Sequence, residues 1–181
     1  MKNNKGISLT TLVITIVVLL ILAGISIQTG SKAITSSKLE NIKTNMLLVK
    51  VKAKEYTENA NFKLGTSIDS LSEEEKSSRI EQARNELVGE EIKDGNIFSN
   101  NVNITTENIL SDNSNYIYYY KLSKDNLESM GLKDLKSSEK DGWYIIKYDI
   151  KNVQVEIYNT VGFENDGNKT YSLSEIEQIR L

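Results

Sequence analysis

The chain has 181 residues, with 22 Lys and Arg against 25 Asp and Glu, so its formal net charge is −3. It contains no histidine, no cysteine and no proline. These absences exclude Ser-His-Asp and Cys-His catalytic sites, zinc sites built from thiolate and imidazole, and stabilising disulfides. The mildly acidic net charge gives no sign of a nucleic-acid-binding surface, which needs clustered Lys and Arg side chains. Because no paired-carboxylate or phosphate-loop motif appears either, we expect a protein that is not an enzyme and needs no cofactor.

Charge divides the chain into segments. No ionisable side chain occurs from Gly6 to Ser31. Residues 31–64 carry seven lysines against three glutamates, a net charge of +4, whereas residues 65–181 carry 13 basic against 22 acidic groups, a net charge of −9. We therefore predict an apolar segment over residues 7–30, a basic amphipathic stalk over 31–64 and an acidic globular head over 65–181.

The first predicted element is a helix that crosses a membrane. Ile7 to Ile27 reads ISLTTLVITIVVLLILAGISI, and a helix of this length spans roughly 30 Å, about one bilayer core. Lys2 and Lys5 precede it, which favours a cytoplasmic N-terminus and an extracellular head on a single-pass membrane protein. Two other interpretations stay open, a conventional cleaved signal with the small-residue pattern Gly24-Ile25-Ser26 and a plain uncleaved anchor.

The start of this segment, KGISLTTL followed by an unbroken apolar run, resembles the N-termini of type IV prepilins and of the pseudopilins of type II secretion systems, especially pilin-like proteins of clostridial type. The resemblance implies a leader peptide, residues 1–6, that a prepilin peptidase removes after Gly6. Ile7 would then become the N-methylated first residue of the mature protein. It also implies two further kinds of partner, membrane lipid and other pilin-like subunits in a filament at the cell surface.

One position departs from the family pattern. The family usually has glutamate as the fifth mature residue, where its charge is thought to pair with a neighbouring subunit's N-terminal amine. That position is Thr11 here, which offers a hydrogen bond but no charge. The departure points to a minor or tip subunit or to a divergent branch, because a carboxylate within the membrane is costly and usually functional.

The stalk has an apolar stripe with the period of a helix. Its members recur at spacings of three and four: Leu39, Ile42, Met46, Val49, Ala53, Tyr56 and Ala60. Leu47, Leu48 and Val51 would widen this stripe, which favours a helix that packs on a sheet. Since no proline interrupts residues 7–62, we predict one long helix, membrane-buried in its first half and packed on the head in its second.

The head reads as an α+β domain of pilin-like layout. Ser72 to Glu75 form a capping box for a helix that buries Ile80, Ala83 and Leu87 and stops at Gly89. The other predicted elements are a short strand near Val102–Thr105, a strand over 116–122, a short helix over 124–130, a hairpin of 143–150 with 152–158, and a last helical turn capped by Ser174. The fold prediction is a long helix against a small antiparallel sheet of three or four strands.

Candidate binding residues are few. Glu164, Asp166 and Asn168 gather oxygen ligands that could hold calcium, although Asp166-Gly167 is also an ordinary turn dipeptide. The tyrosines of 116–120 could form a platform for bases or sugars, but they also fit a half-buried strand, and Trp143 fits a core position.

Two functions follow from these observations. The first is a pilin-like or pseudopilin subunit, cleaved after Gly6 and assembled into a secretion, competence or type IV pilus-like filament. The alternative is a membrane protein that does not polymerise and whose extracellular head binds a ligand or partner.

Overall fold

A computed structural model describes residues 9–93, 116–135, 143–165 and 167–180. Within its first helix, the side chains of residues 9–14, 18 and 20–32 lie outside this description. The chain divides into two compact units, Met1–Glu40 with Leu181 and Asn41–Arg180. The second contains all the strands of the described residues and is called the α+β unit below.

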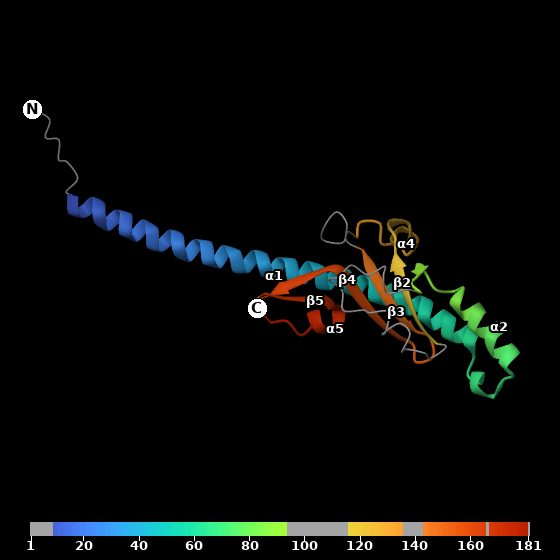
Figure 1. Ribbon diagram of the computed structural model, residues 1–181. Coiled ribbons are helices and arrows are strands. Elements are labelled where there is room, and N and C mark those ends of the chain that lie inside the picture. The colour runs from blue at the N-terminus through green and yellow to red at the C-terminus, as the bar shows by residue number, and fades with distance from the viewer. Residues whose placement is uncertain (1–8, 94–115, 136–142, 166, 181) are drawn as a thin grey trace, which may run out of the picture. The chain divides into compact units, whose positions relative to one another are not determined.

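Helix α1 runs from Leu9 to Leu64 without a break (Figure 1). The absence of proline allows this length, and neither Gly24 nor Gly30 interrupts the helix. The prediction of one long helix is therefore confirmed. Among the residues whose side chains are described, no helix is long and apolar enough to cross a membrane. Most of the segment Ile7–Ile27 lies outside that part of the chain, so its membrane role stays a prediction.

The sheet is an antiparallel meander of five strands in the order β1-β2-β3-β4-β5. The strands are β1 (Glu90–Glu91), β2 (Ile117–Leu122), β3 (Tyr144–Asp149), β4 (Gln154–Asn165) and β5 (Asn168–Ser172). Residues 41–64 of α1 lie along one face of it (Figure 1), which confirms the predicted α+β fold with a helix on an antiparallel sheet. The predicted strand near Val102–Thr105 lies outside the described residues.

The prediction of three or four strands was wrong, because the two outer strands carry weak signals. β1 has only two residues, both glutamate, and β5 has the polar sequence NKTYS. β4 also continues to Asn165, well past the predicted end at Tyr158. An irregularity between Tyr158 and Phe163 hides this continuation. There the Asn159 Oδ1 atom accepts from the backbone N–H of Val161 at 2.9 Å, and Gly162 takes a φ of +71°.

The core lies between α1 and the sheet. The predicted stripe residues of α1 are buried except Tyr56, which is half-buried. Those from Ile42 onward belong to the α+β unit and lie on the side of the large side chains that alternate along β3, namely Tyr144, Ile146 and Tyr148, each of which is fully buried. The predicted widening of the stripe was wrong, because Leu48 and Val51 are exposed and Leu47 is only half-buried. The buried stripe of α1 is therefore narrower than the sequence pattern indicates.

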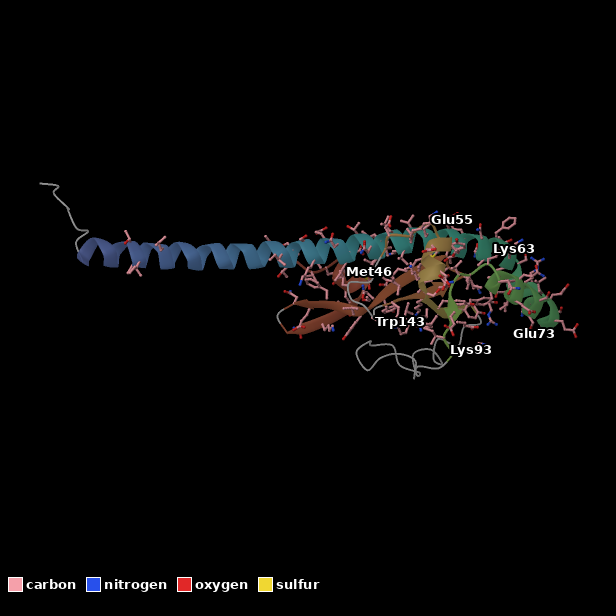
Figure 2. The ribbon with its side chains drawn as sticks, turned by 90° about the horizontal axis from the view of Figure 1, so that it is seen from above. Met46, Glu55, Lys63, Glu73, Lys93 and Trp143 are labelled. Carbon is pink, nitrogen blue, oxygen red and sulfur yellow. The ribbon has the colours of Figure 1, made fainter. Side chains whose placement is uncertain are left out.

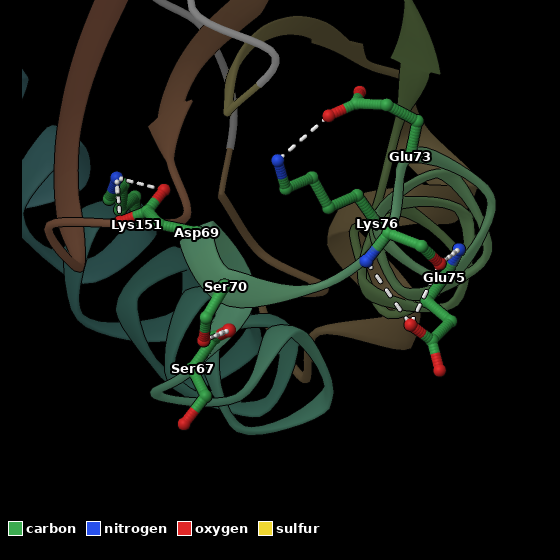
Figure 3. A network of polar contacts seen from close by, with 8 residues as sticks. Ser67, Asp69, Ser70, Glu73, Glu75, Lys76 and Lys151 are labelled. Atoms are coloured by element: carbon green, nitrogen blue, oxygen red, sulfur yellow. Dashed lines mark hydrogen bonds and ion pairs between the residues drawn. The ribbon is translucent and has the colours of Figure 1, made fainter.

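Two contacts join the far end of α1 to the sheet. The Asn61 side chain donates from Nδ2 to the backbone carbonyls of Ile150 and Lys151, at 2.8 and 3.2 Å. After the helix, the Lys151 ammonium donates to both carboxylate oxygens of Asp69 at 3.0 Å (Figure 3). Asp69 belongs to the short 3-10 helix η1 (Ile68–Ser70), so the turn between β3 and β4 is held against the chain that leaves α1.

Helix α2 (Glu73–Arg84) begins with the predicted capping box. The Ser72 hydroxyl accepts from the Glu75 N–H, and the Glu75 carboxylate accepts from the Ser72 N–H at 3.1 Å (Figure 3). The predicted end at Gly89 was wrong, because the helix ends at Arg84 and Asn85 caps it. Gly89 instead has a φ of +124° before β1, where an added Cβ would lie 2.9 Å from the Lys121 carbonyl oxygen.

Two short helices follow in the described part of the chain. Helix α4 (Lys124–Ser129) has the predicted Ser123 cap. Helix α5 (Leu173–Ile176) is capped by Ser172, whose side chain accepts from the Glu175 N–H, and not by Ser174 as predicted. The two serines have similar sequence surroundings. The helix starts at Leu173 because that residue and Ile176 are fully buried, which fixes the position of the first turn.

Candidate interaction surfaces

The N-terminal site residues are not available for a structural test. Gly6 and Ile7 lie outside the described residues, and Thr11 is described only as part of the α1 backbone. The predicted cleavage and methylation site, and the missing glutamate at Thr11, therefore stay predictions.

The calcium candidates are placed on a hairpin turn. Asn165 pairs with Asn168 across β4 and β5, and Gly167, between these two strands, has a φ of +78°. Asp166 itself lies outside the described residues. Glu164 pairs with Lys169, one position along from the Asn165–Asn168 pair, so alternation of side chains puts Glu164 and Asn168 on opposite faces of the hairpin. Within the described ranges, no group of three or more acidic side chains could hold a metal ion.

The tyrosine run does not form one platform. Tyr118 and Tyr120 pair with Tyr148 and Ile146, which places them on the face that α1 covers, whereas Tyr119 lies on the opposite face. Tyr119 and Tyr120 are both buried. The predicted strand is therefore confirmed, but it has buried residues on both faces and not on one face only.

An ionic cluster ties α2 to the edge of the sheet. The Arg84 Nη2 atom donates to a Glu91 carboxylate oxygen, and the guanidinium carbon lies 5.1 Å from the centre of the Tyr118 ring. Lys93 lies 3.6 Å from the same carboxylate. Burial raises the pKa of Tyr118 to about 12, so this phenol stays neutral at physiological pH. The cluster holds elements together and offers no open site.

The face of the sheet that α1 does not cover has its own apolar cluster. Its buried members are Ile92, Tyr119, Ile145 and Tyr171, and Ile117, Trp143 and Tyr158 pack around them. Figure 2 shows Trp143 on the side of the sheet away from α1. Lysines lie over three of these rings, with the Lys121 Nζ atom 4.5 Å from the Trp143 ring centre. Trp143 is thus half-buried at the border of this second apolar cluster. It was predicted as a core residue, and it packs against a core without being fully buried.

A groove opens on this same face. It encloses about 310 Å³, near the lower end for ligand pockets, and its lining includes Ile117, Lys147, Asp149, Gln154, Glu156 and Tyr158. Register explains why these residues meet: Asp149 pairs with both Ile117 and Gln154, and Lys147 pairs with Glu156. The Glu156 carboxylate also accepts from the backbone N–H of Ser174 in α5 at 2.9 Å. We call this site the sheet groove.

The opposite side of the unit carries exposed apolar side chains on α1. Leu48, Val51 and Phe62 are 45%, 67% and 82% exposed. They lie seven and four residues before Glu55 and seven residues after it, so the helical period puts all three on the Glu55 face. Figure 2 shows Glu55 on the side of α1 away from the sheet. We call Leu48, Val51 and Phe62 the outer row.

Sequence reasoning missed both surfaces. The sheet groove is built from four elements, so no local pattern predicts it. The outer row had a signal, because Leu48, Val51 and Phe62 share one helix face opposite Met46 and Ala53, but the apolar character of Leu48 and Val51 fits a wider core stripe equally well. In comparisons with known proteins, no family model, curated protein or solved structure matches this chain.

Proposed function

We propose that this chain is a pilin-like or pseudopilin structural subunit. It is inserted in the cell membrane by its N-terminal helix, cleaved after Gly6 and assembled into a secretion, competence or type IV pilus-like filament. The observation that carries the proposal is α1 itself, a single helix that starts in an apolar segment and whose residues 41–64 supply the core of an α+β unit. One element can then serve both as anchor and as support for the head.

The charge pattern supports the same proposal. An uncharged segment from Gly6 to Ser31 suits a lipid environment, and a polar head with a net charge of −9 suits water. After extraction from the bilayer, the apolar surface of residues 7–27 would be buried again between the helices of neighbouring subunits. Thr11 would offer its hydroxyl to the neighbour's N-terminal amine in place of the usual carboxylate.

Retention of the leader tests the proposal. In cells that contain a prepilin peptidase, Gly6→Leu should block cleavage, and the intact mass should then include residues 1–6. The matched control is Gly24→Leu, which changes a glycine within α1 and should leave cleavage unchanged. A wild-type mass that already includes residues 1–6, or a Gly6→Leu mass that lacks them, would contradict the proposal.

The sheet groove favours a second candidate function. A membrane-anchored protein that does not polymerise could use this groove to bind an extracellular ligand or partner. Such a protein would keep Met1 in its mature form, so the same mass measurement separates the two candidates.

A further inference from the structure

The α+β unit carries two complementary surfaces on opposite sides. The outer row lies on the solvent side of α1, and the sheet groove lies on the face of the sheet that α1 does not cover. Both belong to the compact unit Asn41–Arg180, so their placement relative to each other is fixed by one core.

The charges around the two surfaces are opposite. From Lys43 to Lys54 the helix has four lysines and no acidic residue. Glu55, on the face of the outer row, pairs with Lys52 at 3.1 Å, which leaves the exposed Lys54, one turn after Val51, as the cation offered to a partner. The sheet groove has two carboxylates, Asp149 and Glu156, against one lysine, Lys147, whose Nζ atom lies 5.5 Å from the Tyr119 ring centre. Each carboxylate already accepts one or more hydrogen bonds but has lone pairs left for a further donor.

The apolar content also matches. Ile117 and Tyr158 supply apolar surface to the groove, and a volume of about 310 Å³ has room for a few side chains but not for a large ligand. Leu48 and Val51 are side chains of suitable size, and they are 45% and 67% exposed in the part of the chain that the structure describes.

We propose that a second copy of this chain occupies the sheet groove, with its Leu48 and Val51 in the groove and its Lys54 beside Asp149 and Glu156. This proposal rests on the proposed function. The contact joins unlike surfaces on opposite sides of one unit, so a pair of copies still has one free groove on one copy and one free outer row on the other. Such a contact repeats into an open chain of subunits and does not close as a symmetric dimer.

Cysteine cross-linking of the full-length chain in cells tests the contact. The natural chain has no cysteine, so every disulfide formed must involve an introduced residue. Val51→Cys and Gln154→Cys change two exposed positions, one in each surface. With a mild oxidant, the double variant should give a ladder of covalent dimers, trimers and larger species, and each single variant should stay monomeric.

Three results would overturn the proposal. They are the absence of a ladder in the double variant, dimers of equal yield from Val51→Cys alone, and a stronger ladder when Phe62→Cys replaces Val51→Cys. The second result would indicate a symmetric contact between two α1 helices, and the third a different register along α1.

A charge pair provides an independent readout. Adding Gln154→Lys beside the groove places a cation near the incoming Lys54, so noncovalent self-association detected with an amine cross-linker should fall about fivefold. Adding Lys54→Glu to the same chain should restore it. A fall without restoration would overturn the proposal.

A ladder with Met1 still present would contradict the pilin-like function alone, whereas mature Ile7 without a ladder would contradict this contact alone.

Discussion

Val153 holds a backbone conformation that β-branched residues rarely adopt, with a φ of +53° in the turn between β3 and β4. Left-handed conformations of this kind cost about 1–3 kcal/mol and persist only where the surroundings enforce them. Asp149 does so by accepting hydrogen bonds from both the backbone and side-chain N–H groups of Asn152, at 3.0 and 2.8 Å.

Val153→Asn should therefore stabilise the protein, because asparagine tolerates this conformation. We expect the free energy of unfolding to rise by about 1 kcal/mol in denaturant titrations. Val155→Asn is the matched control, since Val155 is half-buried in β4 and its replacement should destabilise. A loss of stability in both variants would contradict the assigned strain.

Tyr144 makes stability depend on alkaline pH. Burial raises the pKa of its phenol from about 10 to about 12, against a smaller opposite effect of its hydrogen bond with Asn45. The folded chain thus holds this proton more tightly than the unfolded chain, so the stabilisation is complete below pH 10 and is lost as pH rises toward 12. Denaturant titrations at several pH values should show a shallower loss for Tyr144→Phe than for wild type. Parallel curves would contradict this assignment.

At the scale of the elements, α1 has one buried face and one exposed apolar row. Met46→Ala should lower the free energy of unfolding by about 2–5 kcal/mol, because Met46 is fully buried and leaves a cavity. Leu48→Ala, two residues further along, should change it by less than about 0.5 kcal/mol, because Leu48 faces solvent. Thermal and denaturant unfolding in dilute solution measures both. Similar losses would mean that Leu48 belongs to the core.

The same helix shows how far its sequence could be interpreted. A period of three and four residues predicted which side of α1 is buried, because burial on a sheet requires one continuous apolar stripe. The pattern could not fix the width of the stripe, since Leu48 is apolar whether it faces the core or a partner. The same holds for the exposed Phe62. Only tertiary contacts show whether such a residue faces the core or the solvent.

The strands show a different limit. Tyr116–Leu122 and Trp143–Ile150 were predictable because β-branched and aromatic residues dominate them. β1 and β5 were not, since each is an outer strand whose place depends on pairing with β2 or β4 and hardly on its own side chains. The sheet groove depends on register across β2, β3 and β4, which no single segment encodes.

At the scale of the whole molecule, the account requires the apolar segment to enter a membrane. Val17→Asp should remove the protein from the membrane fraction, because a charge near the bilayer centre costs about 3 kcal/mol on the insertion scale. Ser37→Asp is the matched control, an exposed α1 position beyond that segment, and should leave fractionation unchanged. If the Val17→Asp variant were found in the membrane fraction at the wild-type level, the proposed role of this segment as a membrane anchor would be contradicted.

The N-terminal residue of the mature wild-type protein tests the central claim most directly. Intact-mass measurement and N-terminal sequencing of protein purified from its own cells should find N-methylated Ile7, with residues 1–6 absent. A retained Met1, or a start near residue 27, would contradict the proposal of a pilin-like subunit.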